Sequence, residues 1–250
     1  MCLAVLHLSD ADPQRVILVA NRDEFHARPT APLARWPDSP IIGGRDLEAG
    51  GTWLAISPDH RFGLLTNLRG FPIPDSAPSR GGLIPAFLAG TLSARDFMET
   101  LRPTCHQYAG YNLVLGDSTG VWLHSNQGDT PMLRLDAGYH GIGNGAYSRP
   151  WPKVTAGVAA LRRHLERRSP TDRLWETLLD RRVWPDHLLP ETGLPLEIER
   201  PLSAAFIVQP RYGTRSTTVC AIDPSAGSWI EEIRYDPDGR PSGRTRLSIG

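Results

Sequence analysis

The first 24 residues constrain the fold of this chain more than any other stretch. Residues 3–8 and 15–20 are apolar and rich in β-forming side chains, and residues 9–14 between them contain Asp and Pro. This pattern predicts a β-hairpin. Because the second strand of a hairpin of this length returns to the start of the first, we expect the polar run 21–24 to lie beside Cys2.

Cys2 has two interpretations. Cells commonly remove an initiator Met that precedes a small residue, and Cys2 would then carry the free α-amine. Such a residue would hold a nucleophile and a base together, since an α-amine titrates at about 7.7–8.0 and a thiol at about 8.5. The simpler interpretation is a small apolar residue in an N-terminal strand, followed later by a polar turn at 21–24.

Met1-Cys2 and the tetrapeptide Asn-Arg-Asp-Glu at 21–24 resemble the NRDE family, which includes the transport and Golgi organisation proteins. The resemblance implies an N-terminal nucleophile (Ntn) hydrolase-like fold, an αββα sandwich of antiparallel sheets flanked by helices. It implies much less about the substrate. Further blocks similar to the family follow in order across nearly the whole chain: Arg28-Pro29, residues 50–54, Thr66-Asn67, Arg80-Gly81, residues 111–113, Gly143-Asn144, residues 151–153 and residues 212–215.

The order of polar residues is also similar to that in bile-salt and penicillin V amidases, which are Ntn cysteine hydrolases. The resemblance implies that Cys2 is the nucleophile, that Asn67 and Asn144 are pocket asparagines, and that Arg215 is a late site arginine. Those amidases carry Arg and Asp separated by two residues, whereas the two are adjacent here. The candidate catalytic residues are therefore Cys2, Arg22, Asp23, Asn67, Asn144 and Arg215.

An amide hydrolase built on Cys2 needs groups that orient its amine and donors for the oxygen that becomes negative. Side-chain amides at strand ends suit the donor role, and Asn67 and Asn144 are available. Arg22, Asp23, Glu24 and Arg215 suit the orienting role, with Asp23 narrowly ahead of Glu24. Strand alternation puts residues 22 and 24 on one face and 21 and 23 on the other, so all four cannot line one pocket.

The composition limits the other functional classes. The 250 residues predict one domain spanning 1–250. With 27 basic and 27 acidic residues the net charge is zero, which favours neither nucleic acid nor a charged membrane surface as a partner. There is no signal-peptide pattern and no apolar run of the roughly 20 residues that span a bilayer. We therefore expect a cytoplasmic protein without an integral membrane segment.

Metal and cofactor sites have no local support. The eight histidines are scattered, and no paired-cysteine spacing occurs among the three cysteines. The glycines at 43–44 and 50–51 lack phosphate-loop spacing, so we interpret them as points of close backbone approach beside a packed Trp53. We expect neither a metal nor a cofactor.

The elements expected along the chain give an α+β protein with antiparallel sheets. Loops are expected at 25–40 and 183–199, and an apolar helix face is formed by Val154, Val158, Leu161 and Leu165. Strands are expected at 52–56, 62–67, 205–208, 216–222, 228–234 and 244–249, with an antiparallel meander over 112–115, 121–124, 132–135 and 139–143. Helices are expected at 83–88, 93–101 (with a capping-box variant at Ser93) and 172–179.

The function predicted from the residues and the resemblance is an Ntn cysteine amidohydrolase. Its partner would be a small-molecule amide or acyl substrate, cleaved at a linear C–N amide bond. The alternative is a non-catalytic carrier that uses the same pocket for an apolar ligand such as a lipid, acyl-CoA or haem. The acyl group, the amine, the removal of Met1 and the oligomeric state stay open.

Overall fold

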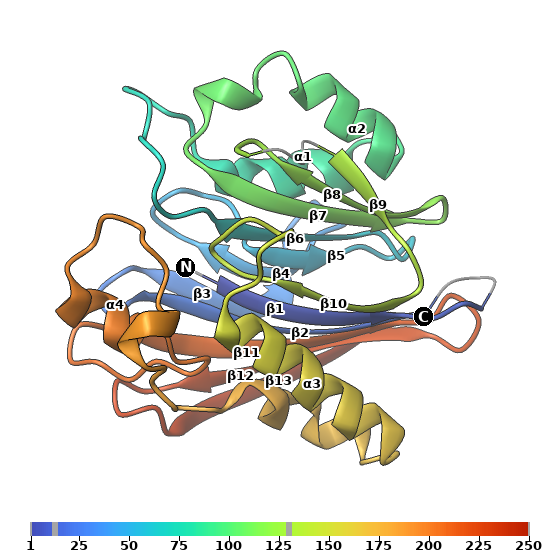
Figure 1. Cartoon of the computed structure of the whole chain (residues 1–250). Coiled ribbons are helices and arrows are strands. Elements are labelled where there is room, and N and C mark those ends of the chain that lie inside the picture. The colour runs from blue at the N-terminus through green and yellow to red at the C-terminus, as the bar shows by residue number, and fades with distance from the viewer. Residues whose placement is uncertain (1, 12–14, 129–131, 250) are drawn as a thin grey trace.

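Two antiparallel sheets stacked face to face form the centre of the computed structural model, which describes residues 2–11, 15–128 and 132–249 (Figure 1). The six-stranded sheet has the order β10 (Gly138–Ile142), β1 (Cys2–Leu8), β2 (Val16–Phe25), β11 (Tyr212–Ile222), β12 (Ser228–Tyr235) and β13 (Pro241–Ile249). The seven-stranded sheet has the order β3 (Thr30–Arg35), β4 (Ile42–Asp46), β5 (Leu54–Ile56), β6 (Phe62–Asn67), β7 (Tyr111–Asp117), β8 (Gly120–Ser125) and β9 (Met132–Leu135).

Helices cover the outer face of each sheet. α1 (Leu83–Ala89) and α2 (Ala94–Leu101) pack on β6, β7 and β8, whereas α3 (Pro152–Glu166) and the 3-10 helix η3 (Thr171–Leu178) pack on β1, β10, β2 and β11. Buried apolar clusters fill all three spaces, one between the sheets and one beneath each helical layer. The layers therefore run helix, sheet, sheet, helix, and the predicted αββα sandwich is confirmed.

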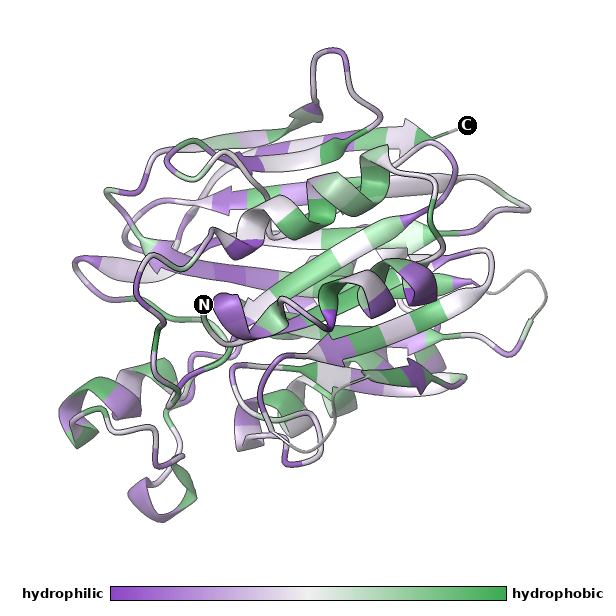
Figure 2. Cartoon of the chain, turned by 90° about the horizontal axis from the view of Figure 1, so that it is seen from above, coloured by the Kyte–Doolittle hydropathy of each residue, from purple (hydrophilic) through white to green (hydrophobic). Residues whose placement is uncertain are grey.

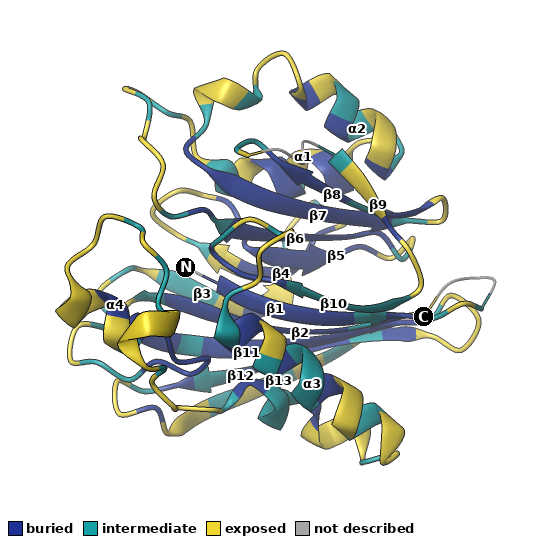
Figure 3. Cartoon of the chain, viewed as in Figure 1, coloured by how far each residue is buried: buried dark blue, intermediate teal, exposed yellow. Residues whose placement is uncertain are grey.

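The N-terminal hairpin forms as predicted. β1 and β2 pair antiparallel from Leu8↔Val16 to Cys2↔Arg22. Alternation in β1 sends Ala4 and Leu6 into the core between the sheets, and sends Leu3 and Val5 beneath α3. Both faces of β1 are consequently buried, as the dark blue strands of Figure 3 show. Cys2 belongs to the face between the sheets.

The predicted cap of α2 and the predicted apolar face of α3 are both confirmed. The Ser93 hydroxyl accepts a hydrogen bond from the Asp96 backbone N–H at the start of α2, which is the predicted cap. Val154 and Leu161 of α3 are buried, and Val158 and Leu165 pack beside them. Seen from above in Figure 2, hydrophobic residues are concentrated in the strands and covering helices, and many connecting loops are hydrophilic.

The predicted meander and the predicted loop at 25–40 both need correction. The meander does not continue from β9 into residues 139–143, because β10 crosses to the other sheet and pairs with β1. Gly138 permits that sharp change of direction with a φ of +136°. Residues 30–35 form strand β3 and not a loop. Pro32 is tolerated there because β3 is an edge strand with a register shift between Ala31 and Ala34.

The region after α3 also differs from expectation. Residues 183–199, predicted as a loop, contain the 3-10 helix η4 (Asp186–Leu188) and the start of α4 (Leu196–Leu202). The acidic residues Glu197 and Glu199 in the first turn favour this helix start. Residues 205–208 form no strand, and Val208 makes only an isolated bridge to Gly213.

The predicted close backbone approach involves Gly51. A Cβ at this position would lie 2.2 Å from the carbonyl carbon of Gly81, and the Thr52 N–H donates to the Gly81 carbonyl oxygen at 3.0 Å. The contact holds the 3-10 helix η1 (Arg80–Gly82) against the start of β5. A further 3-10 helix, η2 (Cys105–Gln107), precedes β7. Among the described residues no helix has the length and hydropathy needed to cross a membrane.

Candidate functional site

A cavity of about 380 Å³ lies where β1 begins and β2 ends, between the two sheets. Its volume falls in the range of small-molecule sites, about 300–1,000 Å³. Four of the six predicted site residues line it: Cys2, Arg22, Asp23 and Asn67. The wall is completed mainly by Glu24, Arg28, Asp46, Thr52, Trp53 and residues 77–81.

The Cys2 side chain is 6% exposed and faces the inter-sheet space beside Arg22, its partner in the β-ladder. Burial raises the pKa of the Cys2 thiol, the Asp23 carboxylate raises this pKa further, and the Arg22 guanidinium opposes both. The thiol is therefore protonated at neutral pH. It needs a base before it can act as a nucleophile.

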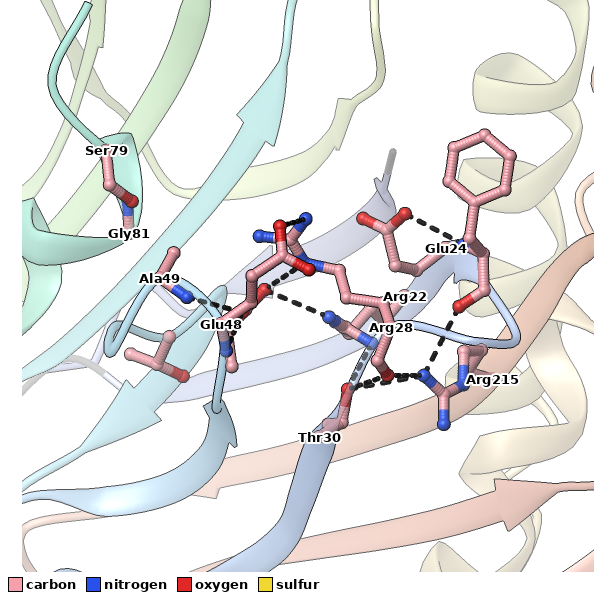
Figure 4. Close-up of polar contacts among 12 residues, drawn as sticks. Arg22, Glu24, Arg28, Thr30, Glu48, Ala49, Ser79, Gly81 and Arg215 are labelled. Atoms are coloured by element: carbon pink, nitrogen blue, oxygen red, sulfur yellow. Dashed lines mark hydrogen bonds and ion pairs between the residues drawn. The ribbon is translucent and has the colours of Figure 1, made fainter.

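Arg22 is held rigidly on the cavity wall. Its guanidinium lies 4.3 Å from the centre of the Trp53 ring, and its Nη2 pairs with Asp46 Oδ2 at 3.3 Å. Nη1 donates to Thr30 Oγ1 at 3.1 Å, and Arg28 Nε binds the same Asp46 oxygen at 2.7 Å (Figure 4). Arg22 thus supplies a fixed positive charge beside the thiol, and Trp53 has the packing role predicted for it as well as a place in the wall.

Asp23 is fully buried at the end of β2. Its Oδ1 accepts a hydrogen bond from Thr214 Oγ1 at 2.6 Å, and its backbone carbonyl accepts one from the Tyr212 hydroxyl at 2.9 Å. Burial raises the pKa of Asp23, and the positive charge of Lys153 on α3 works against that rise. Lys153 is buried too, and burial lowers its pKa to about 8 while Asp23 opposes the change. The two charges therefore stabilise each other beneath the cavity.

The polar run 21–24 divides between two faces, as alternation requires. Asn21 points away from the cavity, where its Nδ2 donates to the carbonyls of Leu178 and Ala205 and its Oδ1 accepts from Thr217. Alternation places the Asp23 side chain on the Asn21 face, where it accepts from Thr214, and Asp23 lines the cavity as well. Arg22, Asp23 and Glu24 all contribute to the wall.

The two predicted pocket asparagines have different places. Asn67 ends β6 and lines the cavity. Asn144 does not line it, and its buried side chain donates from Nδ2 to the Asn67 carbonyl at 2.9 Å. The ladder between β1 and β10 ends at Ala4↔Ile142, and continuing that register by two residues puts Asn144 opposite Cys2. Asn144 therefore fixes the backbone of Asn67 and does not itself form part of the cavity wall, where it was expected.

Arg215 lies outside the cavity wall, contrary to expectation. The β2–β11 register shifts between Thr214 and Ser216, so Arg215 is the extra residue of a β-bulge. A bulge re-aims its side chain, and Arg215 Nη1 donates to the carbonyl of Arg28 and to Thr30 Oγ1 at 3.3 Å. Figure 4 shows Thr30 between Arg215 and Arg22. Arg215 thus braces the segment that supports Arg22.

Sequence reasoning missed three charged wall residues. Arg28 and Asp46 were noted only as part of a loop and a glycine-bracketed pair, and Arg80 only as part of a block that precedes a helix. The acidic partner of Arg22 had no local signal, because Asp46 is 24 residues away. The Arg28-Pro29 and Arg80-Gly81 blocks of the family resemblance were the available indication.

A second, apolar groove adjoins the cavity. It has a volume of about 650 Å³ and shares Glu24 and Asn67 with the cavity wall. Its other lining residues come from the end of β2, from α4, from residues 209–211 and from the start of β11: Phe25, Glu197, Ile198, Pro201, Leu202, Gln209, Pro210, Arg211 and Tyr212. In the part of the chain that the structure describes, no group of three or more His, Cys, Asp or Glu side chains is arranged to hold a metal ion.

Comparison with known sequences finds relatives along most of the chain. The family described as Transport and Golgi organisation 2 matches residues 1–237. The mouse Transport and Golgi organization 2 homolog (Mus musculus) is 33% identical over 246 residues, covering 90% of this chain and 88% of that protein. The human homolog (Homo sapiens) is 31% identical over 245 residues, with the same coverage of both chains.

Comparison with solved structures finds more distant similarity. Penicillin V acylase from Agrobacterium tumefaciens is 12% identical with a TM-score of 0.43, covering 100% of this chain and 92% of its own. A mutant of the conjugated bile acid hydrolase from Clostridium perfringens is 10% identical with a TM-score of 0.46, covering 99% of this chain and 96% of its own.

Proposed function

We propose, for a chain that belongs to the Transport and Golgi organisation 2 family, that Cys2 is the nucleophile of a hydrolase acting on linear C–N amide bonds. The observation that carries the proposal is the position of Cys2 in a polar cavity with Arg22, Asp23 and Asn67. An N-terminal cysteine supplies a nucleophile in its thiol and a base in its α-amine, and Asn67 in the cavity wall supplies a hydrogen-bond donor for the carbonyl oxygen. Met1, whose removal the proposal requires, lies outside the described residues.

The proposed reaction has two steps. The Cys2 α-amine accepts the thiol proton while Sγ attacks the carbonyl carbon, and the Asn67 side-chain amide donates to the oxygen that becomes negative. The C–N bond then breaks, and the proton on the α-amine passes to the leaving amine. A water molecule, deprotonated by the same α-amine, attacks the thioester, releases the carboxylic acid and returns the proton to Sγ.

The surrounding residues would tune these steps. The fixed guanidinium of Arg22 stabilises negative charge on Sγ, and Asp23 stabilises positive charge on the α-amine. Asn144 donates to the backbone carbonyl of Asn67 and so fixes the backbone that carries the amide donor. We expect the reaction to take place in the cytoplasm.

The second candidate function is a carrier for an apolar ligand. The apolar groove that shares Glu24 and Asn67 with the cavity favours it, because such a groove can hold a long hydrocarbon group without any chemistry at Cys2. The two candidates differ in what substitution of Cys2 does.

The deciding experiment compares the wild-type protein with Cys2→Ala and Cys2→Ser. Intact mass first establishes that Met1 is absent, and alkylation then tests for one fast-reacting thiol at Cys2. With a panel of short and long acyl amides, the hydrolase predicts an acyl adduct and turnover in wild type and none in Cys2→Ala, with little change in ligand affinity. Cys2→Ser should keep low activity or none.

A carrier predicts the opposite pattern. Both variants would then retain ligand transfer, and no acyl adduct would form on any amide of the panel. A processed wild type without an adduct, together with full biological activity of Cys2→Ala, would refute the hydrolase and support the carrier.

A further inference from the structure

We infer that the site recognises an amphiphilic ligand: an N-acyl amino acid whose carboxylate binds Arg80 and whose apolar acyl chain lies in the groove between β2 and α4. The inference rests on the proposed function for one point only, the position of the amide carbonyl at Cys2. The juxtaposition of an available guanidinium, the thiol and an apolar groove carries the rest.

Three arginines line the cavity, and two of them already have carboxylate partners. Arg22 and Arg28 both pair with Asp46, at 3.3 and 2.7 Å, and Arg28 also pairs with Glu48 at 2.9 Å. Within the described ranges Arg80 forms no ion pair, and the bond of its Nη1 to the Gly110 carbonyl, 2.9 Å long, is made to a neutral group. Arg80 is thus the cavity arginine with charge available for an anionic ligand.

Arg80 is also placed near the reacting group. It and Cys2 line the same cavity, where Cys2 is buried and Arg80 is half-buried. Burial lowers the pKa of Arg80, and the negative charge of Glu24 offsets part of this effect. A half-buried guanidinium without an anionic partner pays a desolvation cost that a bound carboxylate would recover.

The groove supplies the complementary apolar surface. Phe25 at the end of β2 is 58% exposed and Ile198 on α4 is 45% exposed, so two large apolar side chains flank a concave surface. Figure 3 shows most of α4 exposed. Covering Phe25 and Ile198 with a hydrocarbon chain would remove both from water. Between them the groove continues over Pro201, Leu202, Pro210 and Tyr212.

The orientation of the ligand follows from the shared wall. Glu24 and Asn67 line both cavity and groove, whereas Arg80 lines the cavity alone. From a ligand carbonyl at Cys2, the apolar groove is therefore reached past Glu24. Repulsion by the Glu24 carboxylate keeps a ligand carboxylate away from that side and directs it to Arg80. The acyl chain thus occupies the groove, and the amino-acid half occupies the cavity.

The test measures binding without turnover, in protein that carries Cys2→Ala. The probes are N-decanoylglycine, the uncharged N-decanoyl methylamide and the short N-acetylglycine, titrated by calorimetry. N-decanoylglycine should bind about tenfold or more tightly than the methylamide, because its carboxylate adds a charge-assisted hydrogen bond to Arg80. Each methylene added to the acyl chain should tighten binding by up to about fourfold until the groove is filled.

Substitutions separate the two halves of the ligand. Arg80→Gln should reduce the preference for the glycine probe to about one, and Arg80→Lys should retain part of it. Ile198→Asp should weaken both decanoyl probes about tenfold and leave N-acetylglycine unchanged, since it removes the apolar contact of one large side chain with the acyl chain. The control is Arg163→Gln, at an exposed position on α3, which should change nothing.

Equal binding of the two decanoyl probes would overturn the inference, as would a preference that survives in folded Arg80→Gln. If Arg80→Gln unfolds, Arg80→Lys decides through the partial loss of preference. The proposed function fails separately. If the probes bind as described and the Met1-free wild type never hydrolyses them, the ligand class stands and the hydrolase does not.

Discussion

Replacing Gly51 with Ala tests the contact that positions η1 at the cavity. The new Cβ would lie 2.2 Å from both the carbonyl carbon and the oxygen of Gly81, and 2.7 Å from its Cα. These are backbone atoms, so a side-chain rotation cannot relieve the clash. Either β5 or η1 must move, and the hydrogen bond from the Thr52 N–H to the Gly81 carbonyl is strained or lost.

The expected destabilisation follows from these two effects. Overpacking costs about 1–3 kcal/mol and the lost hydrogen bond about 1 kcal/mol, so Gly51→Ala should lower the free energy of unfolding by about 2–4 kcal/mol. For a chain of this size the melting temperature should fall by about 4–16 °C. Urea denaturation followed by circular dichroism measures the first quantity, and calorimetry measures the second.

The matched control is Gly82→Ala, one residue beyond the contact. A Cβ there meets nothing within 4 Å, and Gly82 has φ −76° and ψ −17°, which Ala adopts readily. This variant should be neutral or more stable by about 0.4–1 kcal/mol. Equal destabilisation by both variants would refute the clash as the cause. Amide turnover lost in Gly51→Ala at unchanged stability would refute the structural assignment of the glycines.

Two further predictions concern buried ionisable side chains. Glu199→Gln should destabilise the protein by about 3–5 kcal/mol in urea denaturation, because it leaves the buried Arg69, 2.9 Å away, without its ion-pair partner. The control Asp238→Asn, in an exposed ion pair, should lower the free energy of unfolding by less than about 1 kcal/mol, and equal losses in the two variants would contradict the prediction. Burial lowers the pKa of His124 to about 4 from 6.5, so the unfolded chain binds more protons between these values and stability should fall as the pH drops through this window. Between pH 7 and 4 the free energy of unfolding of His124→Gln should fall by up to about 3 kcal/mol less than that of wild type. An identical pH dependence of the two proteins would refute the lowered pKa of His124.

The part of the site that could be predicted depends on local geometry. Cys2 and Arg22 meet because a short hairpin fixes its own register, and the apolar pattern of 3–8 and 15–20 specifies that hairpin. Strand alternation was sufficient to turn Asn21 away from the cavity. The sandwich of four layers came from the family resemblance, since element order alone supported only an α+β protein.

The remaining site residues depend on pairings between distant segments. The place of Asn144 requires knowing that β10 joins β1, which follows from a crossover at Gly138 that no periodicity indicates. Arg215 was misplaced because a bulge appears only when β11 is aligned with β2. Arg80 follows a proline-rich loop without periodic pattern, and it reaches the cavity through the contact of Gly81 with Gly51.

The pairing of β2 with β11 also sets the order in which the molecule can assemble. Thr217 of β11 donates to Asn21 of β2 across 196 positions of sequence. The β2 segment is therefore synthesised early but can pair with β11 only near the end of synthesis. Until then β2 has an unpaired edge and the thiol of Cys2 lacks its finished surroundings. Contacts of such long range slow folding, because the intervening chain must be closed first. A ribosome-bound chain that ends before residue 212 should therefore bind chaperones through β2 and react readily with thiol reagents at Cys2, and both properties should disappear once β11 has emerged.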